Sequence, residues 1–271
     1  MLRTVFFISD GTAITAETLG HALLTQFSQF EFQQFRIPFI DNQQKAVEIA
    51  ARIDEQAALD EVCPLVFTTM IDQQLRATIA ASNCQVFDLF GAFIAPLEQQ
   101  LGIAAKPSIG AAHGMIDAEG YEDRMEATNY ALTHDDGMNI RFEDADLILI
   151  GVSRSGKTPT CLYLALHFGI KAANYPLTDD DMDDSRLPAF LLKHKEKLVG
   201  LSINPERLAE IRQTRKPDSR YASLRQCRYE TETAESMFRL SAVPVLQTTS
   251  SSVEEIASRI IQEKNLQRPH F

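Results

Sequence analysis

The sequence contains no run of about 18 consecutive apolar residues, which is the length that a transmembrane helix needs. This holds although 45% of its 271 residues are hydrophobic. We therefore expect no membrane span and no membrane partner. The apolar start at residues 1–8 is too short for a secretory signal and passes at once into a turn, so we expect a cytoplasmic protein. The length suits one large or two medium globular domains.

Closely spaced cysteines are also absent. The four cysteines, Cys63, Cys84, Cys161 and Cys227, lie far apart, and none forms a C-x-x-C pair. The sequence thus indicates neither a zinc site nor a disulfide framework. We interpret these thiols as buried or chemically idle.

Positive charge is scarce, since 26 Lys and Arg residues stand against 37 Asp and Glu residues and the net charge is −11. This balance argues against nucleic-acid binding, which needs a basic face. The segment 206–228 departs from it, because seven cations accompany three acids there. Such a segment either faces an anion or is an ordinary solvated helix face. Its cations are Arg207, Arg212, Arg215, Lys216, Arg220, Arg225 and Arg228.

The first part of the chain alternates short apolar runs with longer amphipathic segments. This rhythm predicts a parallel sheet with helices on both faces, as in a Rossmann-like α/β domain, over residues 1–110. The expected strands are 4–8, 36–40, 64–70 and 85–90, and the expected helices are 16–27, 43–59, 71–81 and 92–101.

The periodicity lapses between residues 102 and 120, and a helix is expected again at 121–132. We place a linker helix and loop at 111–140, followed by a second α/β domain over 141–271. Its expected strands are 146–152, 172–177, 198–204 and 243–247, and its expected helices are 157–168, 205–215 and a last one that opens at a capping box, 252–255. The segments 102–110 and 113–115 are expected to be loop.

The second domain contains the strongest motif of the chain. Residues 151–158 fit the pattern G-x-x-x-x-G-K-[ST] of a phosphate-binding loop, between an apolar strand and a helix. Backbone amides and the helix N-terminus would face the phosphates, Lys157 would reach the terminal phosphate, and Thr158 could hold Mg²⁺. A chance match arises in about one chain in a hundred of this length. The expected nucleotide-binding residues are Gly151, Val152, Ser153, Arg154, Ser155, Gly156, Lys157 and Thr158.

The motif does not determine the reaction. Ras-like GTPases usually carry an Asn-Lys-x-Asp element that reads the base, and this chain has none. A P-loop kinase-like domain of this kind could belong to a small-molecule kinase that uses ATP, to an unusual protein kinase or to a nucleotide sensor without catalytic activity. These classes stay open on the motif alone.

Two adjacent carboxylates, Asp135 and Asp136, follow His134 directly before the second domain. Carboxylates in this setting can accept a hydroxyl proton or bind a metal. The alternative is a polar helix end closed by Gly137. Because a carboxylate is unfavourable at a helix C-terminus, the two interpretations have similar weight.

Three further polar segments have a structural and a functional interpretation. Residues 9–12 follow the first strand and are more readily explained as a turn with helix capping than as a ligand contact. Residues 179–184 hold five carboxylates, and a solvated loop is favoured over a metal or acceptor site. The segment 219–228 is either a surface helix or a basic lid that closes over the phosphates.

The phosphate-binding motif and the polar segments described above resemble those of a known family, the phosphoenolpyruvate synthase regulatory proteins. This family is related to the pyruvate, phosphate dikinase regulatory proteins. The matching stretches are 7–21, 134–137, 151–160, 172–176, 180–183 and 219–228, so the resemblance runs nearly end to end. The choice of the synthase over the dikinase as target rests on overall similarity. The resemblance leaves the oligomeric state open, a homo-oligomer included.

The resemblance implies a bifunctional enzyme in which residues 151–158 bind ADP. One activity is an ADP-dependent serine/threonine kinase that inactivates phosphoenolpyruvate synthase by phosphorylating a threonine. The other reactivates the target by phosphorolysis, with inorganic phosphate accepting the phosphoryl group to give pyrophosphate.

The ADP donor suggests a mechanism in which the β-phosphoryl lies beside Lys157. Arg154 and an arginine of the segment 220–228 would stabilise the charge on the transferring group. Asp135 or Asp136 would accept the threonine proton. The expected catalytic residues are therefore Lys157, Asp135, Asp136 and Arg154, with ADP and inorganic phosphate as ligands and Mg²⁺ as a further candidate.

Overall fold

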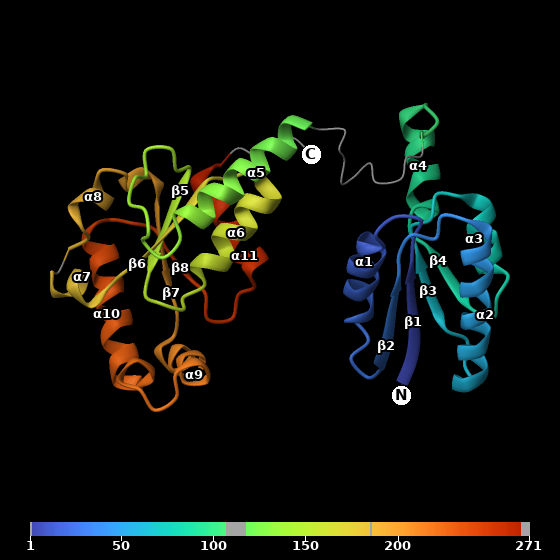
Figure 1. The fold of residues 1–271 in the computed structure, drawn as a ribbon, viewed down its shortest axis with the longest axis horizontal. Coiled ribbons are helices and arrows are strands. Elements are labelled where there is room, and N and C mark those ends of the chain that lie inside the picture. Colours follow the sequence, from blue (N-terminus) through green and yellow to red (C-terminus); the bar gives the residue numbers. More distant parts are fainter. Residues whose placement is uncertain (1, 107–117, 185, 267–271) are drawn as a thin grey trace. The chain divides into compact units, whose positions relative to one another are not determined.

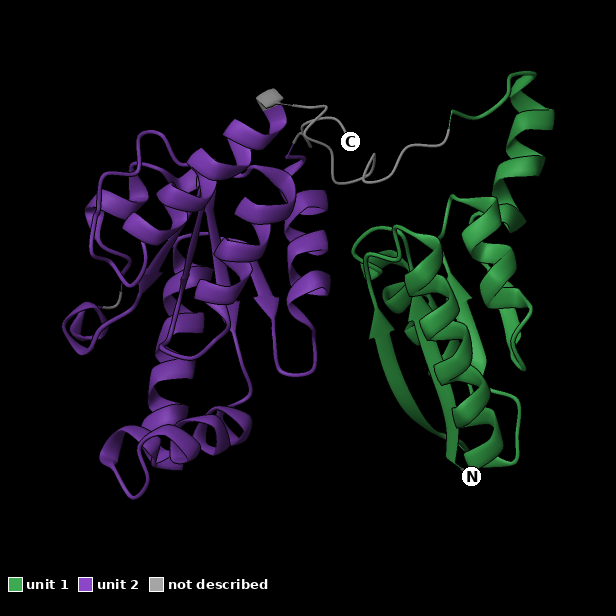
Figure 2. Cartoon of the chain, turned by 45° about the vertical axis from the view of Figure 1, so that its right-hand side comes forward, with its two compact units in different colours: residues 1–114 green, residues 115–271 purple. Residues whose placement is uncertain are grey.

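The computed structural model describes residues 2–106, 118–184 and 186–266 (Figure 1). The chain separates into two compact units, residues 1–114 and 115–271 (Figure 2). Of the loop segments expected at 102–110 and 113–115, residues 107–110 and 113–115 lie outside the described residues. Helix α5 (Ala118–Thr133), which the sequence analysis placed in the linker at 111–140, belongs to the second unit, because Ala127 and Ala131 are buried in its core.

The first unit is built on a four-stranded sheet of order β2-β1-β3-β4, in which every strand pair is parallel. Because side chains alternate along a strand, Phe6 and Ile8 of β1 face the side of α2 and α3, while Val5 and Phe7 face α1. The Rossmann-like prediction is confirmed as a parallel α/β unit. Its elements are β1 (Leu2–Ile8), α1 (Ile14–Leu24), β2 (Glu31–Ile37), α2 (Gln43–Asp60), β3 (Leu65–Thr68), α3 (Gln73–Ala80), β4 (Gln85–Asp88) and α4 (Gly91–Leu101).

The second strand of this unit differs from the prediction. The apolar run at 36–40 suggested a strand there, but β2 covers Glu31–Ile37 and is largely exposed. As an edge strand it pairs only with β1 and needs no continuous apolar run. The chain then turns at Phe39, which has a φ of 59°.

The second unit contains another parallel sheet, of order β6-β5-β7-β8. The strand that leads into the phosphate-binding motif, β5, lies in its interior and is fully buried. Its elements after α5 are β5 (Leu147–Gly151), α6 (Lys157–Phe168), β6 (Ala172–Pro176), α7 (Asp179–Asp183), α8 (Ala189–Leu192), η2 (Lys195–Lys197), β7 (Leu198–Ser202), α9 (Pro205–Arg215), η3 (Arg220–Ala222), α10 (Leu224–Leu240), β8 (Val245–Gln247) and α11 (Val253–Lys264).

Helices cover both faces of this sheet (Figure 1). Leu147 and Leu149 of β5 pack with α5, α6 and α11, while Ile148 and Ile150 pack on the side of α9 and α10. A strand of a parallel sheet that is buried on both faces has a continuous apolar sequence. This explains why β5 lies where the sequence predicted a strand, and α6 begins at Lys157, as the motif predicted. The capping box at the start of α11 is also confirmed, between Ser252 and Glu255.

Helices α7 and α8 were not anticipated, and α10 extends well beyond the surface helix considered for residues 219–228. Helix α10 buries Cys227, Thr231, Ala234 and Phe238 at helical spacing, with Glu230 and Met237 on the same face. The sequence predicted no element at residues 229–240. Helix α7 replaces the loop expected at 179–184, because Thr178 and the third helical residue, Asp181, form a reciprocal capping box. Among the described residues, no helix has both the length and the apolar character that crossing a bilayer requires.

Candidate functional site

The phosphate-binding motif forms the connection between β5 and α6. A Cβ atom at Gly151 would overlap the carbonyl oxygen of Leu201 in β7, so the strand can end this close to its neighbour only with glycine. Gly156 has a φ of 95°, which favours glycine, and Arg154 adopts a φ of 76° in spite of its side chain. For a residue other than glycine, this left-handed backbone conformation costs about 1–3 kcal/mol and tends to occur at functional sites.

Lys157 is the first residue of α6, and its side chain folds back toward the loop. Only 4% of the residue is exposed, and Nζ donates a hydrogen bond to the carbonyl oxygen of Val152 (2.9 Å). Burial lowers the pKa of Lys157 to about 8, although the carboxylates of Asp136 and Asp135 act in the opposite direction. The ammonium is thus a poorly hydrated charge next to the backbone of the loop.

A pocket of about 900 Å³ lies against this loop. Seven of the residues predicted for the site line it, namely Asp135, Asp136, Ser153, Arg154, Gly156, Lys157 and Thr158. The remaining three residues of the motif, Gly151, Val152 and Ser155, are buried and do not line the pocket. The structure therefore brings the predicted carboxylates and the predicted loop onto one cavity, although they are separated in sequence.

Asp135 is held by two side chains of the second unit. The Thr158 hydroxyl donates to Asp135 Oδ1 (2.9 Å), and the side-chain amide of Asn174 in β6 donates to the same oxygen (2.5 Å). The amide also lies 2.9 Å from the Thr158 oxygen and 3.3 Å from Asp136 Oδ1. Asn174 is 1% exposed, so a buried side chain holds the Asp135 carboxylate in place.

Asn174 was not predicted as a site residue. The available signal was a polar residue inside the apolar strand β6, because a buried amide is retained only where it has partners. The backbone reinforces this position, since the amide of Asn174 donates to the carbonyl of His134 (2.9 Å) and the amide of Gly137 donates to the carbonyl of Asn174 (3.1 Å). The 134–137 turn is thereby hydrogen-bonded to the edge strand β6.

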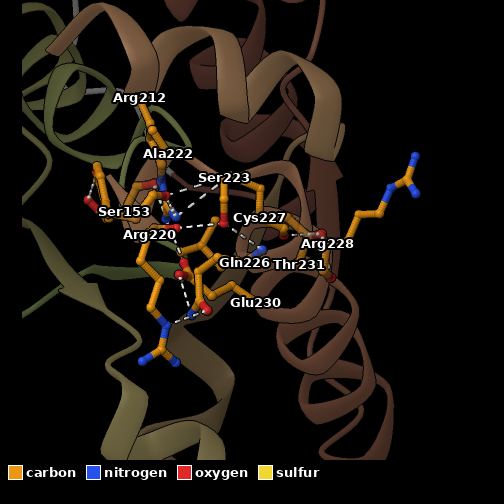
Figure 3. A network of polar contacts seen from close by, with 12 residues as sticks. Ser153, Arg212, Arg220, Ala222, Ser223, Gln226, Cys227, Arg228, Glu230 and Thr231 are labelled. Atoms are coloured by element: carbon orange, nitrogen blue, oxygen red, sulfur yellow. Dashed lines mark hydrogen bonds and ion pairs between the residues drawn. The ribbon is translucent and has the colours of Figure 1, made fainter. Parts of the chain in front are cut away.

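The arginines of the segment 220–228 are not among the residues that line this pocket. Arg228 forms an ion pair with Glu206 (2.6 Å), and Nε of Arg220 donates to Gln226 (3.3 Å). Figure 3 shows both side chains reaching away from the centre of the polar network. The cations that line the pocket beside Arg154 are Arg215 and Lys216, at the end of α9. The cations of this pocket thus come from the end of α9, which is earlier in the chain than the segment 220–228.

Arg212 of α9 joins η3 and α10 to the phosphate loop (Figure 3). The residue is fully buried, and one guanidinium nitrogen donates both to Glu230 (2.6 Å) and to the carbonyl of Ser153 (3.0 Å). The other terminal nitrogen donates to the carbonyl of Tyr221 (3.1 Å), and the group lies over the Tyr221 ring at 4.1 Å. The Tyr221 hydroxyl is in turn 2.9 Å from Ser153 Oγ. The sequence shows Arg212 as one of the cations of the segment 206–228 but does not identify its partners.

Replacing Arg212 with alanine should lower the free energy of unfolding by about 3–5 kcal/mol, because it leaves the Glu230 carboxylate buried without its partner. Urea unfolding of the purified variant measures this change. Arg207→Ala is the matched control, since Arg207 pairs with Glu210 on the surface with side chains 53% and 67% exposed, and its loss should matter little. An Arg212 effect no larger than the Arg207 effect would contradict the assigned role.

The other two polar segments serve local structure. In the first unit, Asp10 Oδ2 accepts hydrogen bonds from the amides of Ile71 (2.6 Å) and Asp72 (3.3 Å), just before α3. The turn is present, but the expected capping of α1 is not, because its N-cap residue Ala13 makes no side-chain cap bond. In the second unit, Asp181 accepts from Tyr175 and from the backbone of Thr178. The described part of the chain contains no cluster of three or more His, Cys, Asp or Glu side chains arranged to hold a metal ion.

Comparison with known proteins gives end-to-end matches. The family model described as Kinase/pyrophosphorylase matches residues 5–261. A protein of Marinobacter nauticus is 52% identical over 269 residues, 99% of both chains. Proteins of Stenotrophomonas maltophilia (50% identity, 98% of both chains) and Hahella chejuensis (50%, 99% of both) match similarly. Each of the three carries the words phosphoenolpyruvate synthase regulatory protein in its name.

Proposed function

This chain belongs to the kinase/pyrophosphorylase family, and we propose that it regulates phosphoenolpyruvate synthase by two opposed phosphoryl transfers. It phosphorylates a threonine of the synthase with ADP as donor and removes that phosphoryl group with inorganic phosphate as acceptor. The observation that carries the proposal is one pocket lined by Lys157, by the phosphate loop and by the carboxylates of Asp135 and Asp136. The names of the relatives support the choice of target.

In the kinase direction, the loop amides and Lys157 hold the diphosphate with its β-phosphoryl toward Asp135 and Asp136. The threonine oxygen attacks the β-phosphorus, the bond to the bridging oxygen breaks, and AMP leaves. The proton of the threonine hydroxyl passes to one of the two carboxylates. Arg154, with Arg215 and Lys216 of the same pocket, stabilises the charge of the transferring group.

In the phosphorolysis direction, inorganic phosphate occupies the place of the β-phosphate. A phosphate oxygen attacks the phosphorus of phosphothreonine, the bond to the threonine oxygen breaks, and pyrophosphate forms. The proton of the attacking hydrogen phosphate passes to the departing threonine oxygen, so the free hydroxyl forms without a proton from the carboxylates. A single anion site beside Lys157 thus serves both reactions, because the pocket contains one phosphate-binding loop.

Mg²⁺ fits the same site. The Thr158 hydroxyl and the Asp135 carboxylate lie 2.9 Å apart, and oxygen ligands of this kind are the ones that Mg²⁺ prefers beside a phosphate-binding loop. Thr158 and Asp135 would hold the ion together with phosphate oxygens. Bound there, it would neutralise part of the charge on the diphosphate.

Nucleotide preference tests the proposal. Thermal unfolding in equal concentrations of ADP and ATP should show the larger stabilisation with ADP, because a ligand stabilises the fold according to its affinity. Preference for ATP would instead favour a small-molecule kinase. Stabilisation by ADP without transfer to any protein target would favour a nucleotide sensor.

The pKa of Lys157 gives a pH prediction. Since burial lowers this pKa to about 8, the ammonium of the free protein loses its proton as the pH rises through 8, and only the cation attracts phosphate. The apparent dissociation constant for ADP should therefore increase about tenfold between pH 7 and pH 9, following the protonated fraction. Calorimetric titration at both pH values measures it. Lys157→Arg should show no such dependence, because guanidinium stays charged. A flat wild-type profile would contradict the prediction.

A further inference from the structure

The pocket beside the phosphate loop has two chemically different halves. One half consists of the loop, Lys157 and the two carboxylates, and it suits phosphate groups. The other half comes from the end of α9 and from η3, and it presents Ile211, Arg215, Lys216 and Tyr221. An inorganic anion gains nothing from an aliphatic side chain and an aromatic ring, so the second half points to an organic portion of the ligand.

Tyr221 is held in a fixed orientation relative to the loop. The guanidinium of Arg212 lies 4.1 Å from the centre of its ring and its hydroxyl is 2.9 Å from Ser153 Oγ. Arg212 is itself fully buried and paired with Glu230. The ring is therefore positioned before any ligand binds, which reduces the entropy lost on binding.

Ile211 and Tyr221 are both half-buried, so each leaves part of its apolar surface to the pocket. A planar base can stack on an aromatic ring and pack against an aliphatic side chain. The guanidinium beneath the ring leaves the opposite side of Tyr221 for such a contact. Arg215 and Lys216 are exposed on the same wall and can contact phosphate oxygens of the same ligand.

We infer that Ile211 and Tyr221 form a nucleoside-binding subsite, and that this subsite distinguishes a nucleoside diphosphate from an inorganic phosphate in the shared pocket. The inference rests on the proposed function and adds the specificity to it. It assigns the anion to residues 151–158 and the base to α9 and η3. The two opposed reactions would then differ in their need for the second half of the pocket, because inorganic phosphate carries no base.

Calorimetric titrations with ADP and with inorganic pyrophosphate, a diphosphate without a nucleoside, test the inference. Tyr221→Ala should weaken ADP binding about tenfold or more through the lost stacking, and Ile211→Ala about threefold to tenfold through the lost apolar contact. Pyrophosphate binding should stay the same in both variants. Tyr221→Phe should retain the ADP affinity, since it keeps the ring.

Tyr229→Ala and Leu224→Ala are matched controls. Both residues lie on α10 and are exposed, 48% and 38%, and neither replacement should change either affinity. Circular dichroism spectra that match wild type establish that each variant is folded.

Equal losses for ADP and pyrophosphate would overturn the inference, because the two residues would then act by supporting the loop. Unchanged ADP binding in both alanine variants would overturn it as well, and so would a Tyr221→Phe variant as weak as Tyr221→Ala. Wild-type protein that binds pyrophosphate as tightly as ADP would exclude the subsite and leave the proposed transfer intact. Wild-type protein that binds neither ligand would refute the proposed function itself.

Discussion

Replacing Lys157 with methionine should abolish phosphoryl transfer in both directions, with a loss of about a thousandfold or more. Lys157 is the buried cation of the phosphate loop, at 4% exposure, and both reactions develop negative charge beside it. Methionine has a similar length and no charge, and an apolar side chain at this buried position should not unfold the protein. Rates of threonine phosphorylation from ADP and of pyrophosphate release from the phosphorylated target measure the two effects.

The control for this variant is Lys195→Met, because Lys195 is exposed in η2 of the same unit and should be dispensable. Thermal unfolding shows whether the Lys157 variant is folded. The informative result is the comparison of the two directions. If phosphorolysis survived while ADP-dependent phosphorylation was lost, the two reactions could not share one anion site.

Asn replacements of the two carboxylates should have unequal effects. Asp135 accepts hydrogen bonds from Thr158 and from Asn174, whereas Asp136 is exposed and contacts Asn174 at 3.3 Å. A positioned general base contributes about a hundredfold to ten-thousandfold in rate, and we expect a loss in this range for the residue that accepts the threonine proton. Asp135 is the better oriented of the two, so Asp135→Asn should show the larger loss in the kinase direction.

Phosphorolysis should be less sensitive to these replacements, because phosphate is already an anion and needs little help from a base. Single-turnover rates in both directions, measured for Asp135→Asn and Asp136→Asn in parallel, give the comparison. An equal loss in both directions at Asp135 would point to Mg²⁺ binding or positioning, in agreement with its contact to Thr158. A larger kinase loss at Asp136 would transfer the role of the base to that residue.

Local signals explain why much of the second unit could be predicted. The apolar run in β5 continues into a glycine-bounded loop and then into α6, so strand, loop and helix are encoded by contiguous residues. The helices α6 and α9 have the bounds that the sequence predicted, Lys157–Phe168 and Pro205–Arg215. Asp135 and Asp136 could be selected as candidates because adjacent carboxylates fit a helix end poorly.

The remaining features depend on residues that meet only after folding. Asn174 reaches Asp135 across 39 positions, and Arg212 reaches Ser153 across 59 positions. Neither partner is suggested by the sequence around it. The same limitation misplaced the expected arginine, since the charge of the 206–228 segment was visible but its orientation was not. The buried Glu230 of α10 likewise has its partner, Arg212, on another helix.

The most direct test of the account is transfer from ADP to the target protein. Phosphoenolpyruvate synthase should be incubated with this protein and ADP, then digested and analysed by mass spectrometry. We expect phosphothreonine on the synthase and AMP in solution, followed by loss of the phosphate and release of pyrophosphate when inorganic phosphate is added. Phosphothreonine formed from ATP but not from ADP, or no transfer despite ADP binding, would contradict the account.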